Sequence, residues 1–226
     1  MPKMLSPELI QLRDDCAEFA TQHLLIHAGQ PAPDARDQVR AAAKAAGLFA
    51  MTQPTAFGGS AAGQLALCVA RETLAAANPP FMDSVFGPSP GVLGGVQEPL
   101  ADSHLGPLIA GEKRSSFGFT EPDDAAPTRG VIEGDKVVIT GQKSYVTGGA
   151  DADFINALVR VEGRGPSMIV IDTHLPGVKI EKKFVSLDGS HYAAFSFTNV
   201  AVPKHLEIGI LCPDQFIHIT EVGSYL

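Results

Sequence analysis

The sequence contains no tryptophan, only 3 tyrosines and only 3 cysteines among its 226 residues. Cys16, Cys68 and Cys212 are far apart and form no C-x-x-C pair, so neither a disulfide framework nor a zinc knuckle is predicted. The N-terminal segment also lacks the basic and apolar regions of a secretory signal peptide. We therefore expect a reducing, cytoplasmic location.

Basic residues are few, with 17 Lys and Arg against 25 Asp and Glu, which gives a net charge of −8. This balance argues against nucleic acid and anionic membranes as partners. The longest uncharged stretch, residues 45–70, is interrupted by proline, glycine and glutamine, so it predicts two helices and a turn instead of a membrane span. With 45% hydrophobic residues, the chain can bury a core of one or two domains.

The first half of the chain has the apolar periodicity of helices. Ser6 and Pro7 are a capping residue and a first-turn proline, so a helix is predicted to start there and to end before Gly29. Asp34 is expected to cap a second helix that ends at Gly47. Further helices are predicted over residues 60–77 and 99–110.

After residue 113 the apolar period changes from 3.6 to about 2, which indicates strands. We predict an α+β protein with an N-terminal helical domain (1–113), a closed or sandwiched antiparallel β-barrel/sandwich domain (114–212) and the start of a further, truncated helical domain (213–226). The expected strands cover residues 116–120, 128–133, 136–143, 153–161, 167–172, 178–182 and 193–202.

Several common site motifs are missing. His23 and His27 are four residues apart on a helix, but the glutamate of H-E-x-x-H is absent, so no metal site is predicted. The sequence has no G-x-G-x-x-G, no P-loop and no G-x-S-x-G, which argues against Rossmann dinucleotide-binding proteins, P-loop NTPases and hydrolases of the G-x-S-x-G type.

Two segments of the second half resemble the acyl-CoA dehydrogenase family. They are Ser116-Phe-Gly-Phe-Thr-Glu-Pro122 and Gly141-Gln-Lys-Ser-Tyr-Val-Thr-Gly-Gly149, which occur in the order found in that family. Similar segments lie at 54–59, 106–112 and 197–203, so the resemblance covers nearly the whole chain. It implies a flavoprotein that uses FAD.

The resemblance also assigns the cofactor-binding residues. It implies that Thr120 and Thr147 hydrogen-bond the flavin ring, that Phe119 and Val146 offer main-chain contacts, and that Tyr145 covers the ring. Phe117 would lie toward the substrate. The protein part of such a site supplies binding and orientation, while the cofactor carries the redox chemistry.

The sequence departs from the family in two places. Asp123 and Asp124 replace a glycine-rich turn that holds the CoA moiety in relatives, and we expect a solvated turn there. The helical bundle that supplies the catalytic glutamate of the family has no counterpart, and Glu221 is expected on a polar helix face. No catalytic residue is assigned, and the chain alone is expected to be inactive.

The function expected from the resemblance is α,β-dehydrogenation of an acyl-CoA or other acyl thioester with hydride transfer to FAD. A complementary chain, as a heteromer or homo-oligomer, would supply the missing parts. Two alternatives stay open at this point. One is a flavin-dependent monooxygenase or oxidase of the same superfamily, and the other is a non-catalytic subunit or fragment of a heteromeric complex.

Overall fold

A computed structural model describes residues 5–29, 34–187 and 191–210. The chain divides into two compact units, Met1–Pro90 and Gly91–Leu226. The helix predicted over 215–226, together with Cys212 and Glu221, lies outside the described residues.

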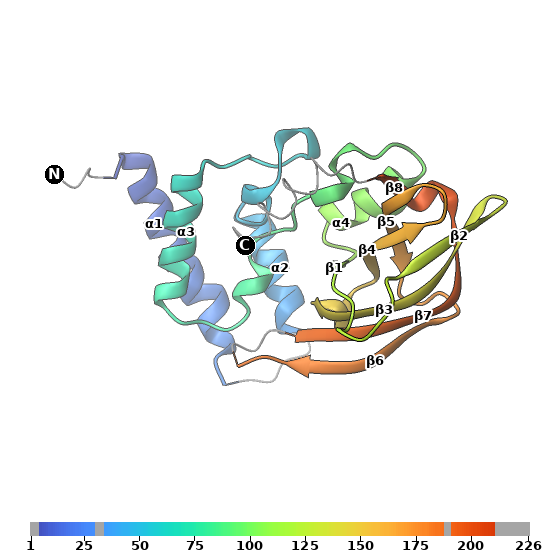
Figure 1. The fold of residues 1–226 in the computed structure, drawn as a ribbon. Coiled ribbons are helices and arrows are strands. Elements are labelled where there is room, and N and C mark those ends of the chain that lie inside the picture. The colour runs from blue at the N-terminus through green and yellow to red at the C-terminus, as the bar shows by residue number, and fades with distance from the viewer. Residues whose placement is uncertain (1–4, 30–33, 188–190, 211–226) are drawn as a thin grey trace. The chain divides into compact units, whose positions relative to one another are not determined.

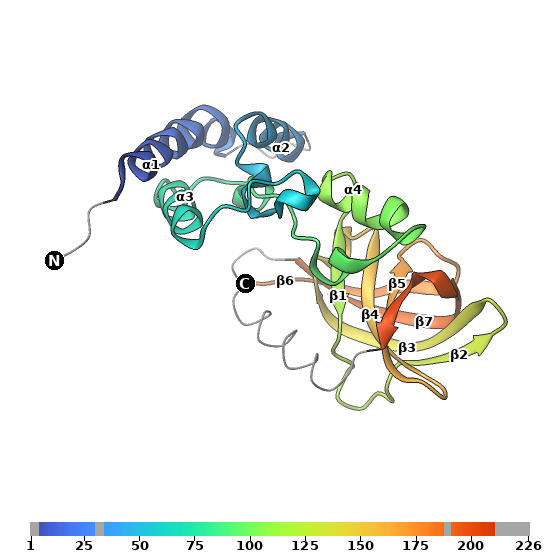
Figure 2. The same ribbon diagram turned by 90° about the horizontal axis from the view of Figure 1, so that it is seen from above.

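The first unit is helical (Figure 1). Its helices are α1 (Pro7–Phe19), which continues through the single turns η1 (Ala20–Leu24) and η2 (Leu25–His27), then α2 (Ala35–Ala45) and α3 (Gln64–Ala76). Shorter turns are η3 (Phe49–Thr52), η4 (Thr55–Phe57) and η5 (Met82–Ser84). Helices α1 and α3 lie side by side, as Figures 1 and 2 both show.

The ends of these helices follow the sequence signals with two exceptions. The Ser6 hydroxyl accepts a hydrogen bond from the Leu9 amide at 3.4 Å, and Gly47 adopts the left-handed conformation with φ of 74°. Asp34 makes no side-chain capping bond, and α3 begins at Gln64 instead of at residue 60 or 61. The core of the unit gathers apolar side chains from all three helices, including Cys16, Phe19, Leu24, Val39, Ala43, Ala70 and Leu74.

The second unit is built on one strongly curved, mostly antiparallel sheet (Figure 2). Its strands are β1 (Ser115–Gly118), β2 (Arg129–Glu133), β3 (Lys136–Thr147), β4 (Phe154–Val161), β5 (Gly165–Asp172), β6 (Val178–Val185), β7 (His191–Pro203) and β8 (Glu207–Ile210). The turns are η6 (Gly91–Gly95), η7 (Ala101–Leu105), η8 (Gly149–Asp151) and η9 (Lys204–Leu206), and α4 covers Gly106–Ile109.

The strand order is β6-β7-β3-β2-β4-β5-β8, and β1 pairs with β4 off this path. The seven predicted strands are all present. The expectation of closure is wrong, because in the described residues β6 and β8 stand at opposite ends of the order without pairing. The pairs β1 with β4 and β2 with β4 are parallel, and the others are antiparallel. Strand β8 was not anticipated.

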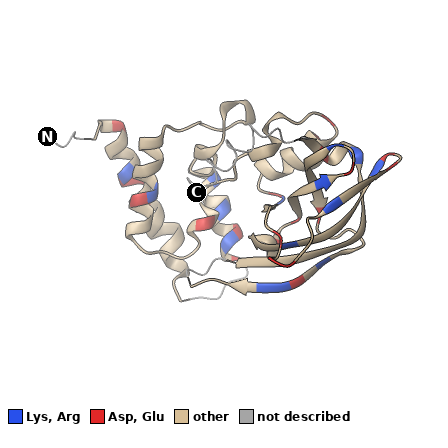
Figure 3. Cartoon of the chain, in the orientation of Figure 1, with Lys and Arg blue, Asp and Glu red and all other residues tan. Residues whose placement is uncertain are grey.

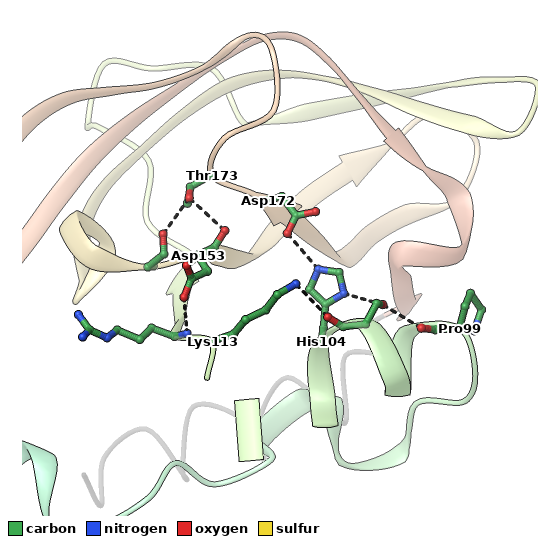
Figure 4. Close-up of polar contacts among 9 residues, drawn as sticks. Pro99, His104, Lys113, Asp153, Asp172 and Thr173 are labelled. Atoms are coloured by element: carbon green, nitrogen blue, oxygen red, sulfur yellow. Dashed lines mark hydrogen bonds and ion pairs between the residues drawn. The ribbon is translucent and has the colours of Figure 1, made fainter. Parts of the chain in front are cut away.

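The division of the chain into compact units falls earlier than the change of sequence pattern at residue 113. Residues 91–113 belong to the second unit, together with the sheet. Figure 4 shows two polar contacts at the end of this segment: the Lys113 ammonium donates to the Ser103 carbonyl within the segment at 2.9 Å, and the amide of the next residue, Arg114, donates to the Asp153 carboxylate at 2.7 Å.

A buried histidine joins η7 to the end of β5. His104 is 3% exposed, and its Nε2 donates to the Asp172 carboxylate at 3.1 Å (Figure 4). The His104 ring also packs edge-on against Phe154, with the ring centroids 4.9 Å apart. The hydrogen bond from His104 lowers the pKa of Asp172, burial opposes this shift, and the nearby Lys113 charge adds to the lowering.

We predict that Asp172→Asn destabilises the second unit by about 1.5–3 kcal/mol at pH 7, the usual range for a hydrogen bond to a charged group. Because the folded pKa of Asp172 is depressed, its contribution is present above the unfolded-chain pKa of about 3.9 and is lost as the pH falls through the folded value.

Urea unfolding between pH 3 and pH 7 checks this expectation. Asp151→Asn is the matched control, because Asp151 faces His191 at 3.7 Å in an exposed pair. Equal losses for Asp172→Asn at both ends of the pH range would contradict the assignment.

Candidate functional site

The structure brings the two motif segments of the second unit together. The Ser144 amide on β3 donates to the Thr120 carbonyl at 2.8 Å, just after the end of β1. Strand β2 pairs with β3 only as far as Arg129 and Thr140, so the second half of β3 runs past β2 and lies along the 116–121 segment instead. The two motif segments therefore lie next to each other where Thr120 meets Ser144.

The aromatic members of this region are exposed and paired. Phe117, which is 42% exposed, stacks on Phe119 with the ring centroids 5.9 Å apart. Tyr145 is 69% exposed and stacks on Phe184 of β6 at 5.6 Å. The four rings thus form two stacked pairs, one beside each motif.

The two threonines are exposed at strand ends, whereas Val146 is buried. Within the described part of the chain, neither the Thr120 nor the Thr147 hydroxyl has a hydrogen-bond partner. Because Val146 buries its side chain, only its main chain could contact a ligand. The roles that the sequence suggested for these residues stay predictions.

A buried ion pair connects the two motifs. Lys143 is fully buried, and its ammonium donates to Glu121 at 2.5 Å and to the Phe119 carbonyl at 3.0 Å. Glu121 also accepts the Thr128 amide at 3.2 Å. Both charged residues belong to the motif segments, but the sequence alone predicts no role for either of them.

The two charges of this pair have shifted pKa values. Burial lowers the pKa of Lys143, although Glu121 opposes that shift by favouring the charged ammonium. Burial alone would raise the pKa of Glu121, but the hydrogen bond and charge of Lys143 and the Thr128 amide hold it below the ordinary value. The carboxylate is therefore ionised at neutral pH and compensates the buried ammonium.

A bulge in β3 sets the direction of Tyr145. The register with β7 shifts between Lys143 and Val146, and Tyr145 adopts a left-handed conformation with φ of 52°. A non-glycine residue in this region is uncommon and often marks a functional segment. The bulge turns Tyr145 outward while Val146 points into the core.

The other candidates from the sequence have structural surroundings that need no ligand. Asp123 and Asp124 are exposed in a turn closed by a bond from the Ala125 amide to the Pro122 carbonyl, at 2.9 Å, as expected. Among the described residues, no cluster of three His, Cys, Asp or Glu side chains could hold a metal ion. None of the described helices has the length and apolar character needed to cross a membrane.

Two family models match successive parts of the chain. Residues 6–96 match the model described as "Acyl-CoA dehydrogenase, N-terminal domain", and residues 116–200 match "Acyl-CoA dehydrogenase, middle domain". The chain belongs to the acyl-CoA dehydrogenase family. The family models matched do not include a C-terminal domain.

Among curated relatives, the acyl-CoA dehydrogenase FadE29 of Mycobacterium tuberculosis is 33% identical over 113 residues, which are 45% of this chain and 29% of FadE29. A crystal structure of an acyl-CoA dehydrogenase from Mycobacterium smegmatis has a TM-score of 0.74 and 27% identity, and it covers 96% of this chain and 61% of that protein. The chain thus spans about three fifths of the length of this structural neighbour.

Two more distant structures share the fold. The ChsE4-ChsE5 complex of Mycobacterium tuberculosis has a TM-score of 0.78 at 20% identity, covering 99% of this chain and 62% of that chain. A glutaryl-CoA dehydrogenase from Mycobacterium smegmatis in complex with FADH2 has a TM-score of 0.70 at 19% identity, covering 92% of this chain and 56% of that chain.

Close packing beneath the bulge generates a prediction about Gly149. A Cβ at this position would lie 2.8 Å from both Phe195 and Val146, with no space to move into. We predict that Gly149→Ala destabilises the unit by about 1–3 kcal/mol, the usual cost of overpacking a core. Urea unfolding measures this cost.

Gly95→Ala is the matched control, because a Cβ there meets nothing within 4 Å and φ is not positive. We expect its effect to stay within about 0.5 kcal/mol. Equal effects of the two substitutions would show that the packing under Val146 is loose.

Proposed function

We propose that this chain supplies the flavin-ring side of an acyl-CoA dehydrogenase, which oxidises an acyl thioester to its α,β-unsaturated product. The observation that carries the proposal is the junction of the two motif segments at Thr120 and Ser144. Thr120, Thr147 and the main chain of Phe119 and Val146 would hold the FAD ring, which would supply the hydride acceptor for this oxidation, and a base would take the α-proton. The family assignment supports FAD as the cofactor.

The residues present fit a flat heterocycle. Two exposed hydroxyls, Thr120 and Thr147, stand at the ends of segments whose aromatic neighbours, Phe117 and Tyr145, are also exposed. A flavin ring needs hydrogen-bond donors at its edge and apolar walls at its faces, and these side chains offer both. Phe119 and Val146 would add main-chain contacts.

Proton removal beside a carbonyl requires a base within hydrogen-bond reach of the substrate. No described residue is assigned to this task, so we propose that the base comes from a further domain or a second polypeptide. A chain of the ChsE4-ChsE5 complex shares the fold, and at 20% identity this likeness shows the fold alone. A cytoplasmic location remains our prediction.

We predict that Thr147→Val keeps the fold but weakens FAD binding, because it removes one hydrogen bond worth about 0.5–1.5 kcal/mol, or roughly 2- to 13-fold in affinity. Titration of the purified chain with FAD, followed by flavin absorbance and fluorescence, measures the change. Thr198→Val is the control, because Thr198 is an exposed threonine of the neighbouring strand β7. Unchanged affinity and spectrum in Thr147→Val would remove this assignment.

A second prediction concerns turnover. The purified chain without a partner should show no acyl-CoA-dependent dye reduction, because a general base typically contributes about 10²–10⁴-fold to the rate. Adding the polypeptide that co-purifies with the native protein should restore activity. Dye reduction by the chain alone would mean that a residue within this sequence acts as the base.

A further inference from the structure

We propose that Lys143 and Glu121 are positioning residues for the flavin ring, which fix Thr120 relative to Tyr145 and Thr147. This inference rests on the function proposed above and assigns a task to two residues that do not themselves reach a ligand. Lys143 is fully buried, and only 27% of the Glu121 side chain is exposed.

The argument starts from the cost of burying an ammonium group. An unpaired buried charge is strongly unfavourable, so the Lys143 ammonium needs hydrogen-bond acceptors in the folded protein. Its two acceptors are the Phe119 carbonyl and the Glu121 carboxylate, which are the residues on either side of Thr120. Lys143 therefore holds the chain at two points around Thr120.

The other end of the connection is equally fixed. Lys143 lies two residues before Tyr145 on β3, and the Ser144 amide donates to the Thr120 carbonyl at 2.8 Å. The side chain and the main chain of adjacent residues thus bind three consecutive residues of the other segment. A shift of one segment along the other would break all of these bonds together.

Glu121 adds a second connection through Thr128. It accepts the Thr128 amide, and the Thr128 hydroxyl donates to the Gln142 carbonyl at 3.1 Å. Thr128 is 1% exposed, so this path is protected from water. These contacts close a loop of connections. Glu121 bonds to Thr128, Thr128 bonds to Gln142, and Gln142 is the chain neighbour of Lys143, which bonds back to Glu121.

Gly118 provides the space for the lysine stem. A Cβ at residue 118 would lie 3.3 Å from the Lys143 Cγ and 3.0 Å from Ile155. The glycine between Phe117 and Phe119 therefore allows Lys143 to pass beneath β1 and reach the Phe119 carbonyl. The main chain of the first motif therefore packs closely against the Lys143 side chain of the second motif.

Positioning matters here because the two threonine hydroxyls have no partners of their own among the described residues. Their location depends on the main chain alone, and recognition of a rigid ring requires its donors within about 0.5 Å of the productive position. A buried pair that fixes the main chain on both sides is well suited to this task.

The test compares Lys143→Met and Glu121→Gln with the wild type in FAD titrations at a temperature at which each variant is folded, judged by circular dichroism. Met keeps the length and apolar stem of Lys143, and Gln keeps an acceptor for the Thr128 amide. We expect FAD affinity to fall roughly tenfold or more in Lys143→Met and severalfold in Glu121→Gln, with a changed flavin absorbance band. Arg129→Met is the control, because it breaks an exposed ion pair with Glu162 in the same sheet.

The outcomes separate the inference from the proposed function. If the wild type binds no flavin, the proposed function and the positioning role both fail. If the wild type binds and the folded variants bind with equal affinity and an unchanged spectrum, only the positioning role fails, even where the variants are less stable. A weaker and spectrally altered flavin complex in the variants, with a normal one in Arg129→Met, supports the role.

A readout on the wild type covers the case in which neither variant folds. Bound flavin should slow hydrogen exchange at the Ser144 amide, because the ligand stabilises the bond to the Thr120 carbonyl. Exchange at Ser144 that is unchanged by saturating FAD would overturn the proposal.

Discussion

The ammonium of Lys143 has no contact with water, and this one burial constrains the whole region around it. A buried cation needs a carboxylate and further acceptors, and the 119–121 segment offers both to Lys143. An apolar residue of similar size could fill the same space without this requirement. The pair therefore specifies the register between two segments that lie more than twenty residues apart, beyond any gain in stability.

The sheet topology leaves room for this junction. Strand β2 stops pairing with β3 at Thr140, while β3 continues to Thr147 along β7. Strand β1 pairs in parallel with β4 instead of extending the antiparallel order. The main-chain groups of the second half of β3 consequently face the 116–121 segment, and the bulge at Tyr145 turns an aromatic ring toward solvent at the same place.

The sequence predicted the elements of this fold better than their arrangement. Alternating apolar residues located seven strands, whereas the four-residue strand β8 was not predicted. Local patterns carry no information on strand order, so the open sheet could not be foreseen. The motifs indicated the exposed threonines and aromatic residues, yet the pairing of Glu121 with Lys143 emerges only when distant segments meet. The pairing of His104 with Asp172, 68 residues apart, was invisible for the same reason.

The charges near the site act over different ranges. Lys143 is buried and 27% of the Glu121 side chain is exposed, and their opposite charges lie 2.5 Å apart, so the pair adds little net charge to its surroundings. Asp123 and Asp124 are exposed in a turn, where salt screens them within about 8–10 Å. Figure 3 shows basic residues along β6, which carries Lys179, Lys182 and Lys183. The acidic turn therefore contributes a negative field that salt weakens, whereas the Lys143–Glu121 pair adds little net charge beside Thr120.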